Sequence, residues 1–373
     1  MIIGVPSEIK NHEYRVGLVP ASVQELTARG HKVNIQAGAG LGINIDDAAY
    51  QKAGANIVGS AQDVFAGSEM IVKVKEPLAQ ERAMLKEDQL LFTYLHLAPD
   101  VPQTDDLIDS GAVCVAYETV TSNTGALPLL APMSEVAGRM AIQAGAHCLE
   151  KSNLGRGMLL GGVSGVEPAK VVIIGGGVVG RNAAQMAVGM YADVAVLDNN
   201  IDTLRQIDAQ FSGRVKTVFS NQYNLEKYVA DADLVIGGVL IPGAAAPKLV
   251  TRAMISGMKP GSAIVDVAID QGGCFETSVA TTHADPTFIV DDVVHYCVAN
   301  MPGAVARTST FALNNATLPF VLQLANQGYK QALLANPHLL NGLNVIHGKL
   351  TNQSVGESQA KQYIEALSAI KAA

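Results

Sequence analysis

Lys170-Val-Val-Ile-Ile-Gly-Gly-Gly-Val-Val-Gly180 is the stretch that decides the fold of this chain. Its apolar run predicts a buried β-strand, and the glycines after it form the pattern G-x-G-x-x-G at Gly175, Gly177 and Gly180. A second apolar run, Val-Ala-Val-Leu, ends at Asp198, eighteen residues after the last glycine. This order is typical of a dinucleotide-binding unit, which consists of a strand, a glycine turn, a helix and a second strand with an acidic residue at its end.

Each of these residue types has a physical reason for its position. Gly175 permits a tight turn, Gly177 lets a pyrophosphate approach the backbone, and Gly180 lets the helix pack close to the strand. The N-terminus of the helix offers unpaired N–H groups and a partial positive charge to the phosphates. Asp198 can accept hydrogen bonds from the ribose hydroxyls, and its charge repels a 2′-phosphate. The expected cofactor is therefore NAD rather than NADP.

The composition indicates a protein of about two domains without the charge pattern of a nucleic-acid-binding protein. The chain has 373 residues and a formal net charge of −8, with Lys and Arg scattered rather than clustered, so nucleic acid is not an expected partner. A membrane is not expected either, because no window contains about 18 uninterrupted apolar residues. Its first residues, Met-Ile-Ile-Gly-Val-Pro, are typical of a strand rather than a secretory signal. Four widely spaced cysteines favour free thiols in a cytoplasmic protein and no metal site: Cys114, Cys148, Cys274 and Cys297.

Apolar runs alternate with helix-like stretches in two successive regions. This rhythm predicts parallel sheets flanked by helices, an α/β fold with two Rossmann-like domains. In the first region the expected strands are residues 2–5, 32–37, 69–75, 89–96 and 112–118. In the second they are residues 171–174, 194–198, 215–219, 234–239, 263–267 and 293–298.

Helix-like segments define the expected domain boundaries. A long helix over residues 132–151 leads into the glycine motif, and helices over 310–333 and 354–370 follow the last strand. These last two helices are too few to form a domain, so we expect them to pack against the first region. The predicted substrate domain is therefore discontinuous, with residues 1–130 and 305–373, and the NAD-binding domain covers residues 131–304.

Polar residues follow the predicted strands, where open α/β sheets bind ligands. Hydride transfer to a nicotinamide requires a cation for the substrate carboxylate, a group that polarises the reacting carbon and an acid/base. Arg15, after the first strand, could bind a carboxylate bidentately, or be an ordinary surface arginine. Lys75 could polarise a carbonyl, or be a solvated strand end. His96 could transfer protons or only form structural hydrogen bonds, and Asp270 could relay a proton or only form a turn.

The chain as a whole resembles the alanine dehydrogenase family, which also contains the NAD(H)-binding part of proton-translocating transhydrogenase. The resemblance covers essentially the full length and rests on many segments in the same order. These segments are Gly4-Val-Pro-Ser-Glu-Ile-Lys10, Asn11-His-Glu-Tyr-Arg-Val-Gly17, Val72-Lys-Val-Lys-Glu-Pro77, Tyr94-Leu-His-Leu-Ala98, Pro132-Met-Ser-Glu-Val-Ala-Gly138, the glycine loop, Asp266-Val-Ala-Ile-Asp-Gln-Gly-Gly273 and Val298-Ala-Asn-Met-Pro-Gly303.

The resemblance implies roles for individual residues. Arg15 and Lys75 are implied to bind the substrate carboxylate and carbonyl, with His96 and Asp270 as the acid/base residues of an active site in the interdomain cleft. Thr203 and Val279 stand where some relatives have basic cofactor contacts, so we assign them none. Besides the three glycines, the implied NAD contacts are Ser134, Val178, Val179, Asp198, Ser220, Val239, Leu240, Val267, Ala268, Ile269, Asp270, Val298, Ala299, Asn300 and Met301.

The implied reaction is the NAD-dependent oxidative deamination of L-alanine to pyruvate and ammonia, and the reverse reductive amination. Hydride transfer would give an iminium, water would add to form a carbinolamine, and His96 or Asp270 would move the protons. The resemblance also implies a homohexamer. Two alternatives are a transhydrogenase nucleotide domain, which would share the NAD site without needing an amino-acid acid/base, and an NAD-binding sensor without catalysis. His96 in Leu-His-Leu-Ala and Glu76 in Lys-Glu-Pro favour the dehydrogenase.

Overall fold

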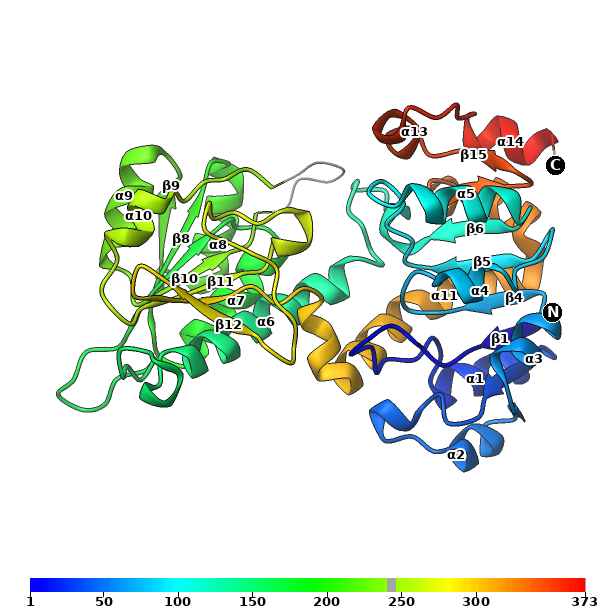
Figure 1. Cartoon of the computed structure of the whole chain (residues 1–373), viewed down its shortest axis with the longest axis horizontal. Coiled ribbons are helices and arrows are strands. Elements are labelled where there is room, and N and C mark those ends of the chain that lie inside the picture. Colours follow the sequence, from blue (N-terminus) through cyan, green and yellow to red (C-terminus); the bar gives the residue numbers. More distant parts are fainter. Residues whose placement is uncertain (240–245, 373) are drawn as a thin grey trace. The chain divides into compact units, whose positions relative to one another are not determined.

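The computed structural model describes residues 1–239 and 246–372, and these fold as two compact units. Unit 1 consists of Met1–Met133 together with Val305–Ala373, and unit 2 is Ser134–Ala304. In each unit helices pack against a central sheet (Figure 1). The chain therefore has the two-domain α/β fold that the alternating pattern predicts.

Unit 1 contains an eight-stranded sheet in the order β15-β14-β6-β5-β4-β1-β2-β3. Strands β1 to β6 are parallel, and β14 runs antiparallel to both β6 and β15. The strands are β1 (Ile2–Val5), β2 (Lys32–Gln36), β3 (Asn56–Val58), β4 (Met70–Val72), β5 (Leu90–Thr93), β6 (Val113–Ala116), β14 (Leu343–Ile346) and β15 (Lys349–Leu350). The helices are α1 (Pro20–Thr27), η1 (Leu41–Ile43), α2 (Asp47–Lys52), α3 (Ala61–Ala66), α4 (Ala79–Arg82), α5 (Val101–Asp109), η2 (Tyr117–Thr119), α11 (Ala306–Ala335), α12 (Pro337–Leu340), α13 (Gln353–Gln359) and α14 (Ala366–Ala372).

The central strands of unit 1 are buried on both faces. Every residue of β4, β5 and β6 is buried, as expected of parallel strands covered by helices on each side. Helix α11 contributes Val321 and Leu324 to the same core as Ile3 and Phe92. Burial of each such side chain stabilises the fold by about 1.5–3 kcal/mol, so the C-terminal segment is an integral part of unit 1.

Unit 2 contains a seven-stranded sheet in the order β12-β13-β11-β10-β7-β8-β9, in which β12 runs antiparallel to β13 and the other pairs are parallel. The strands are β7 (Lys170–Ile174), β8 (Asp193–Asp198), β9 (Val215–Phe219), β10 (Leu234–Gly237), β11 (Ala263–Asp266), β12 (Thr287–Val290) and β13 (Val293–Tyr296). The helices are α6 (Ala131–Cys148), which begins in the last residues of unit 1, η3 (Lys151–Asn153), α7 (Val178–Gly189), α8 (Ile201–Phe211), α9 (Gln222–Asp231), α10 (Arg252–Ser256), η4 (Ile269–Gln271) and η5 (Met301–Val305).

The parallel parts of the two sheets share one strand order. In unit 1 the chain proceeds outward from β1 through β2 and β3, then returns to place β4 on the other side of β1. In unit 2 it does the same around β7, with β10 on the far side. Loops at such a reversal diverge, and ligands of doubly wound sheets bind at the carboxyl ends of the strands there.

Three sequence predictions need correction. The sheets are mixed rather than wholly parallel, because β12, β14 and β15 are antiparallel. The helix predicted over residues 354–370 is two helices, because Ala360 is left-handed (φ 52°) and the N–H of Ile364 donates to the carbonyl of Leu350 at 3.0 Å. The strands before Lys75, His96 and Glu118 end earlier than predicted, which leaves these three residues beyond the strands.

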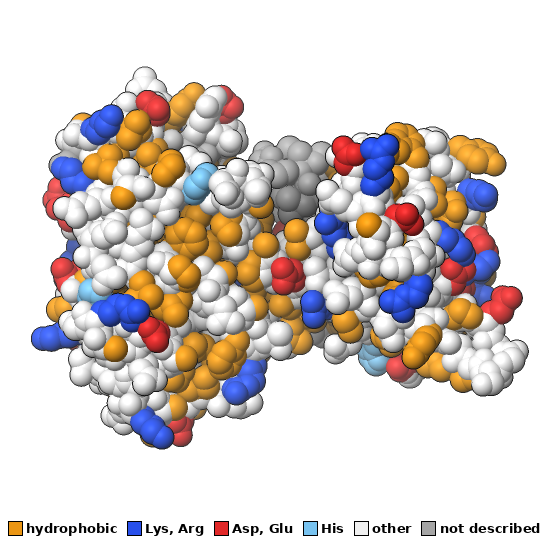
Figure 2. All heavy atoms as spheres, turned by 180° about the vertical axis from the view of Figure 1, so that it is seen from behind, with side chains coloured by type: hydrophobic (Ala, Val, Ile, Leu, Met, Phe, Trp, Pro, Cys, Tyr) orange, Lys and Arg blue, Asp and Glu red, His pale blue; other side chains and the backbone are white. Residues whose placement is uncertain are grey.

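Charged side chains of both signs are interspersed on the face of the molecule shown in Figure 2, rather than gathered by sign. Hydrophobic side chains form several patches on the same face. Within residues 1–239 and 246–372, no helix is long and apolar enough to cross a membrane.

Candidate active site

The predicted substrate residues follow neighbouring strands of unit 1. Arg15 lies in the loop after β1, Lys75 in the loop after β4 and His96 in the loop after β5. Because β1, β4 and β5 are adjacent parallel strands, these loops lie at one edge of the sheet, next to its reversal point. The structure therefore brings a guanidinium, an ammonium and an imidazole to the same edge of unit 1.

Arg15 is held by a carboxylate that the sequence analysis did not identify. Its Nε and Nη2 donate to the two carboxylate oxygens of Glu13 at 2.6 and 2.5 Å, and its Nη1 lies 3.0 Å from the Met133 sulfur. Arg15 is only 2% exposed. Burial lowers the pKa of the guanidinium, but the hydrogen bond and charge of Glu13 outweigh this and raise it above its ordinary value. Arg15 is thus a fixed cation with an imposed orientation.

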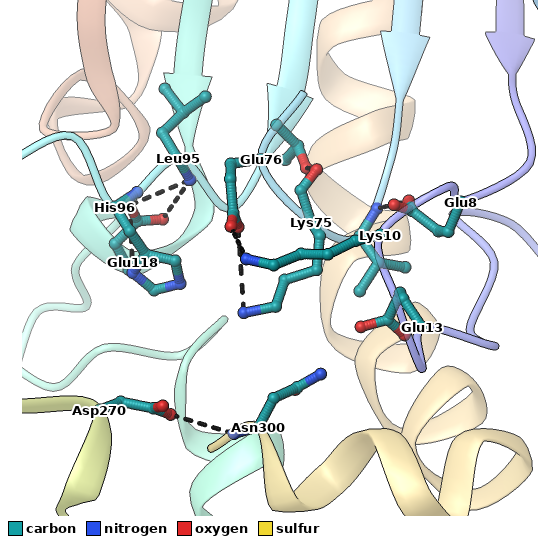
Figure 3. Close-up of polar contacts among 12 residues, drawn as sticks. Glu8, Lys10, Glu13, Lys75, Glu76, Leu95, His96, Glu118, Asp270 and Asn300 are labelled. Carbon is teal, nitrogen blue, oxygen red and sulfur yellow. Dashed lines mark hydrogen bonds and ion pairs between the residues drawn. The ribbon is translucent and has the colours of Figure 1, made fainter. Parts of the chain in front are cut away.

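Lys75 belongs to a cluster of two lysines and one glutamate. In Figure 3 the ammonium groups of Lys10 and Lys75 both point toward the carboxylate of Glu76. Lys10 donates to one carboxylate oxygen, and the Lys75 Nζ lies 3.9 Å from the other. Burial raises the pKa of Glu76, but the charges of the two lysines outweigh it and hold the pKa below its ordinary value. The cluster is therefore net positive, as an anionic ligand requires.

His96 is held in a conformation unusual for its residue type. Its φ is 50°, a left-handed value that costs an L-residue about 1–2 kcal/mol. The Glu118 carboxylate accepts the His96 backbone N–H at 2.6 Å and lies 3.9 Å from the ring Nδ1. The His96 ring stacks on Tyr94 with 5.6 Å between centroids and an interplanar angle of 7°. Strain of this kind persists where the surroundings enforce it, and it is frequent at functional sites.

A buried charge triad beneath these loops was also missed by the sequence analysis. The Lys73 ammonium donates to Glu8 at 3.1 Å and to Glu81 at 2.7 Å, and all three side chains are at most 2% exposed. Glu8 also accepts the Val74 N–H at 2.7 Å, and Glu81 accepts the Leu78 N–H at 2.9 Å. The segment that carries Lys75 is therefore anchored at both of its ends.

Asp270 lies in unit 2, in η4 after β11, and it is exposed. Its carboxylate accepts the backbone N–H of Asn300, after β13, at 3.4 Å (Figure 3). The loop that contains Asp270 is organised by Asp266, which accepts the backbone N–H of Cys274 at 2.9 Å and the Ser278 hydroxyl at 2.6 Å. Burial raises the pKa of Asp266 despite these donors. Asp266 thus fixes a loop that leaves Asp270 accessible.

The glycine loop of unit 2 has the geometry that a dinucleotide requires. Gly175 has φ 98°, and a Cβ at Gly180 would lie 1.8 Å from the Gly175 carbonyl oxygen, so neither position tolerates a side chain. A Cβ at Gly177 would meet nothing within 4 Å, which leaves space in front of the loop. No side chain caps the helix that starts at Val178, so its first N–H groups face that space. These residues fit the pyrophosphate of NAD.

Asp198 has a structural contact in addition to its predicted cofactor role. One carboxylate oxygen accepts the N–H of Gly176 at 2.7 Å, and the other accepts the N–H of Asn200 at 2.8 Å. A carboxylate has about four acceptor positions, so two remain for ribose hydroxyls. Asp198 therefore links the glycine loop to the tip of β8.

Most of the other predicted cofactor residues follow the strands of the same sheet. Ser220 follows β9 and donates its N–H to the carbonyl of Asp198 at 2.9 Å. Ser134 lies on α6, one helical turn before Gly138. A Cβ at Gly138 would lie 2.2 Å from the Val179 carbonyl, so α6 approaches the start of α7 closely.

One of the remaining predicted residues, Leu240, lies outside the described residues. Thr203 lies on α8, and Val279 is 65% exposed. Val239, Val267, Ala268, Ile269, Val298, Ala299, Asn300 and Met301 follow β10, β11 and β13.

The described part of the chain contains no group of three or more His, Cys, Asp or Glu side chains placed to hold a metal ion. The four cysteines are buried free thiols, and burial raises the pKa of each to about 12. At neutral pH they are protonated and unreactive, so the chemistry of the site rests on nitrogen and oxygen groups.

Comparison with known proteins identifies two family profiles. "Alanine dehydrogenase/PNT, N-terminal domain" matches residues 4–137, and "Alanine dehydrogenase/PNT, C-terminal domain" matches residues 141–353. An alanine dehydrogenase of Halomonas elongata is 60% identical over 370 residues, 99% of this chain and 100% of the relative. A solved L-alanine dehydrogenase has a TM-score of 0.94 and 52% identity, covering 96% of this chain and 99% of its own. A transhydrogenase of Sinorhizobium meliloti has a TM-score of 0.83 and 26% identity, covering 94% of this chain and 100% of its own.

Proposed function

The chain belongs to the alanine dehydrogenase/PNT family, and from this premise we propose that Arg15, Lys75, His96 and Asp270 carry the NAD-dependent interconversion of L-alanine with pyruvate and ammonia. One observation supports these roles above all others: a fixed guanidinium, a net-positive lysine cluster and an exposed imidazole follow adjacent strands of a single parallel sheet. An α-amino acid needs this combination, because it presents a carboxylate together with an amine that exchanges protons.

Arg15 binds the substrate carboxylate. A guanidinium has five N–H donors; Glu13 accepts from Nε and Nη2, and Nη1 contacts the Met133 sulfur. The Glu13 carboxylate fixes the plane of the guanidinium, so a bound carboxylate is oriented as well as neutralised. Lys75 stabilises the negative charge that develops on the oxygen when water adds to the iminium carbon.

His96 and Asp270 move the protons of the reaction. Bound NAD supplies the chemistry of hydride acceptance from the alanine Cα. Water then adds to the resulting iminium carbon and loses a proton to His96 or Asp270, which forms the carbinolamine. Return of that proton to the amine nitrogen lets ammonia leave, and the carbinolamine hydroxyl gives its own proton to the same base as the carbonyl of pyruvate forms. In the reverse direction the same groups deliver protons in the opposite order.

We further propose that unit 2 holds NAD through the glycine loop and the strand ends named above, and that the protein is a cytoplasmic homohexamer. Support for the hexamer is the family resemblance alone. For the cytoplasm it is the four free thiols, because secreted proteins usually pair their cysteines. The molar mass in solution tests the hexamer against the chain mass of 39.0 kDa.

The activity is tested by absorbance at the NADH wavelength. With NAD and L-alanine at alkaline pH we expect NADH to accumulate, and with NADH, pyruvate and ammonium at neutral pH we expect it to be consumed. D-Alanine is the control and should give no signal. Binding of NADH without turnover in either direction would contradict the proposed function and favour a sensor.

Cofactor choice gives a second test. Replacement of Asp198→Asn removes the charge that repels a 2′-phosphate but keeps an oxygen for the Gly176 N–H. We expect the ratio of kcat/KM for NADP to that for NAD to rise about tenfold, the equivalent of about 1.4 kcal/mol. Asp202→Asn, an exposed change on α8, is the matched control. An unchanged ratio in Asp198→Asn would mean that other residues select the cofactor.

A further inference from the structure

Glu118 and His96 are brought together by the sheet of unit 1. β5 and β6 are parallel neighbours, and their pairing ends at Thr93 and Ala116, which lie opposite each other. His96 follows Thr93 by three residues and Glu118 follows Ala116 by two, so both side chains extend from the same edge (Figure 3). The contact between them is therefore a consequence of strand register.

The Glu118 carboxylate is held by backbone N–H groups of the loop after β5. It accepts the N–H of Leu95 at 3.1 and 3.3 Å and the N–H of His96 at 2.6 Å. The oxygen that accepts from His96 also lies 3.9 Å from the ring Nδ1 of that residue. Glu118 is 15% exposed and the imidazole 43%, so the carboxylate lies in the protein while the ring remains accessible. Two backbone donors keep the carboxylate from turning away from the ring.

The imidazole is also held on one face. Tyr94 stacks on it at an interplanar angle of 7°, and the Tyr94 hydroxyl donates to the carbonyl of Leu129 at 2.5 Å. Tyr94 is 3% exposed, so its ring cannot move away. The stacked face and the carboxylate on the Nδ1 side together restrict the directions in which Nε2 can point.

We propose that Glu118 is the positioning residue for acid/base chemistry at His96, an inference that rests on the proposed function. The Glu118 oxygen lies 3.9 Å from Nδ1, beyond hydrogen-bond distance, but its negative charge favours the hydrogen of the neutral ring on this nearer nitrogen. Nε2 then presents its lone pair. When the added water loses a proton, that proton goes to Nε2, and the electron pair of the O–H bond stays on the substrate oxygen. The imidazolium formed then faces a fixed negative charge, which stabilises it.

Glu118→Gln separates this role from simple support of the backbone. The glutamine keeps an oxygen for the Leu95 and His96 N–H groups, but it lacks the negative charge that favours a hydrogen on Nδ1. We expect kcat to fall about tenfold to a hundredfold in both directions, less than for a fully buried orienting carboxylate. The KM for alanine and the affinity for NADH should change less than about twofold, because the substrate and cofactor contacts are elsewhere.

Glu87→Gln, an exposed change in unit 1, is the matched control and should leave kcat unchanged. A wild-type kcat in Glu118→Gln, with the protein folded, would overturn the inference.

The histidine tautomer gives a readout that does not depend on activity. In nitrogen-15 spectra of histidine-labelled protein at alkaline pH, the signal that disappears in His96→Asn should have the hydrogen on Nδ1.

A wild-type His96 with its hydrogen on Nε2 would refute the positioning role even if Glu118→Gln failed to fold. Absence of alanine-dependent NADH formation in the wild-type protein would instead refute the proposed function. The tautomer measurement would then still decide whether Glu118 orients the ring.

Discussion

His96→Asn is expected to lower kcat about 10²–10⁴-fold in both directions, the usual contribution of a general acid/base. Asparagine is the appropriate replacement because His96 has φ 50°, and asparagine adopts this left-handed conformation more readily than most residues. Its backbone N–H still donates to Glu118, so the loop after β5 is preserved. Alanine at this position would add backbone strain to the loss of the imidazole.

The affinity for NADH should change less than about twofold in His96→Asn, because the glycine loop belongs to unit 2 and His96 to unit 1. Stopped-flow absorbance and NADH fluorescence titration measure the two effects separately. His347→Asn is the matched control, since His347 also has a positive φ, 46°, but lies between β14 and β15. A His96→Asn variant with near wild-type kcat would show that His96 is not the acid/base residue.

The nucleotide-binding unit was the part most accessible to sequence reasoning. Its signal is local, because the strand, the glycines and the second strand tip lie within thirty residues of sequence. The glycine geometry then follows from the positive φ at Gly175 and the close approach at Gly180, while Gly177 leaves open space in front of the loop. What the motif did not indicate is that Asp198 also holds the glycine loop through Gly176, since that contact depends on how β8 lies beside β7.

The partners of the substrate residues could not be predicted in the same way. Glu118 is the last residue of the strand predicted over 112–118, but its contact with His96 depends on the register of β5 with β6. Glu13 lies only two residues from Arg15, and nothing in that spacing shows that the two side chains bend toward each other. Antiparallel β14 was missed because its four buried residues do not alternate in polarity.

The sequence around Lys73 could have predicted a buried charge cluster. Lys73 stands in the apolar run Met70-Ile-Val-Lys-Val, inside the predicted strand, and a lysine in a parallel strand covered on both faces is expected to be buried with a partner. Two carboxylates were needed, and they come from Glu8, after β1, and Glu81, in α4. The sequence shows that such partners exist without showing which residues they are.

Lys73→Met is expected to lower the free energy of unfolding of unit 1 by about 3–5 kcal/mol, because it leaves two buried carboxylates without their cation. Urea unfolding followed by circular dichroism measures the change at pH 8. The triple variant Glu8→Gln, Lys73→Met, Glu81→Gln should recover most of the loss, since a neutral replacement of a buried ion pair is often harmless. Lys52→Met, at the exposed end of α2, is the control and should change stability by less than about 0.5 kcal/mol.

The loss in Lys73→Met should also depend on pH in a defined direction. Burial raises the pKa of Glu8 in the folded protein despite the opposing charge of Lys73 and the Val74 N–H, and removal of the ammonium raises it further. A group whose folded pKa is raised binds its proton more tightly in the folded state. Its contribution to stability is therefore fully present below the unfolded pKa and is lost as the pH rises through the folded pKa. The destabilisation should accordingly be smaller at pH 5 than at pH 8, whereas a loss that is equal at both values would mean that lost packing, rather than unpaired charge, is the cause.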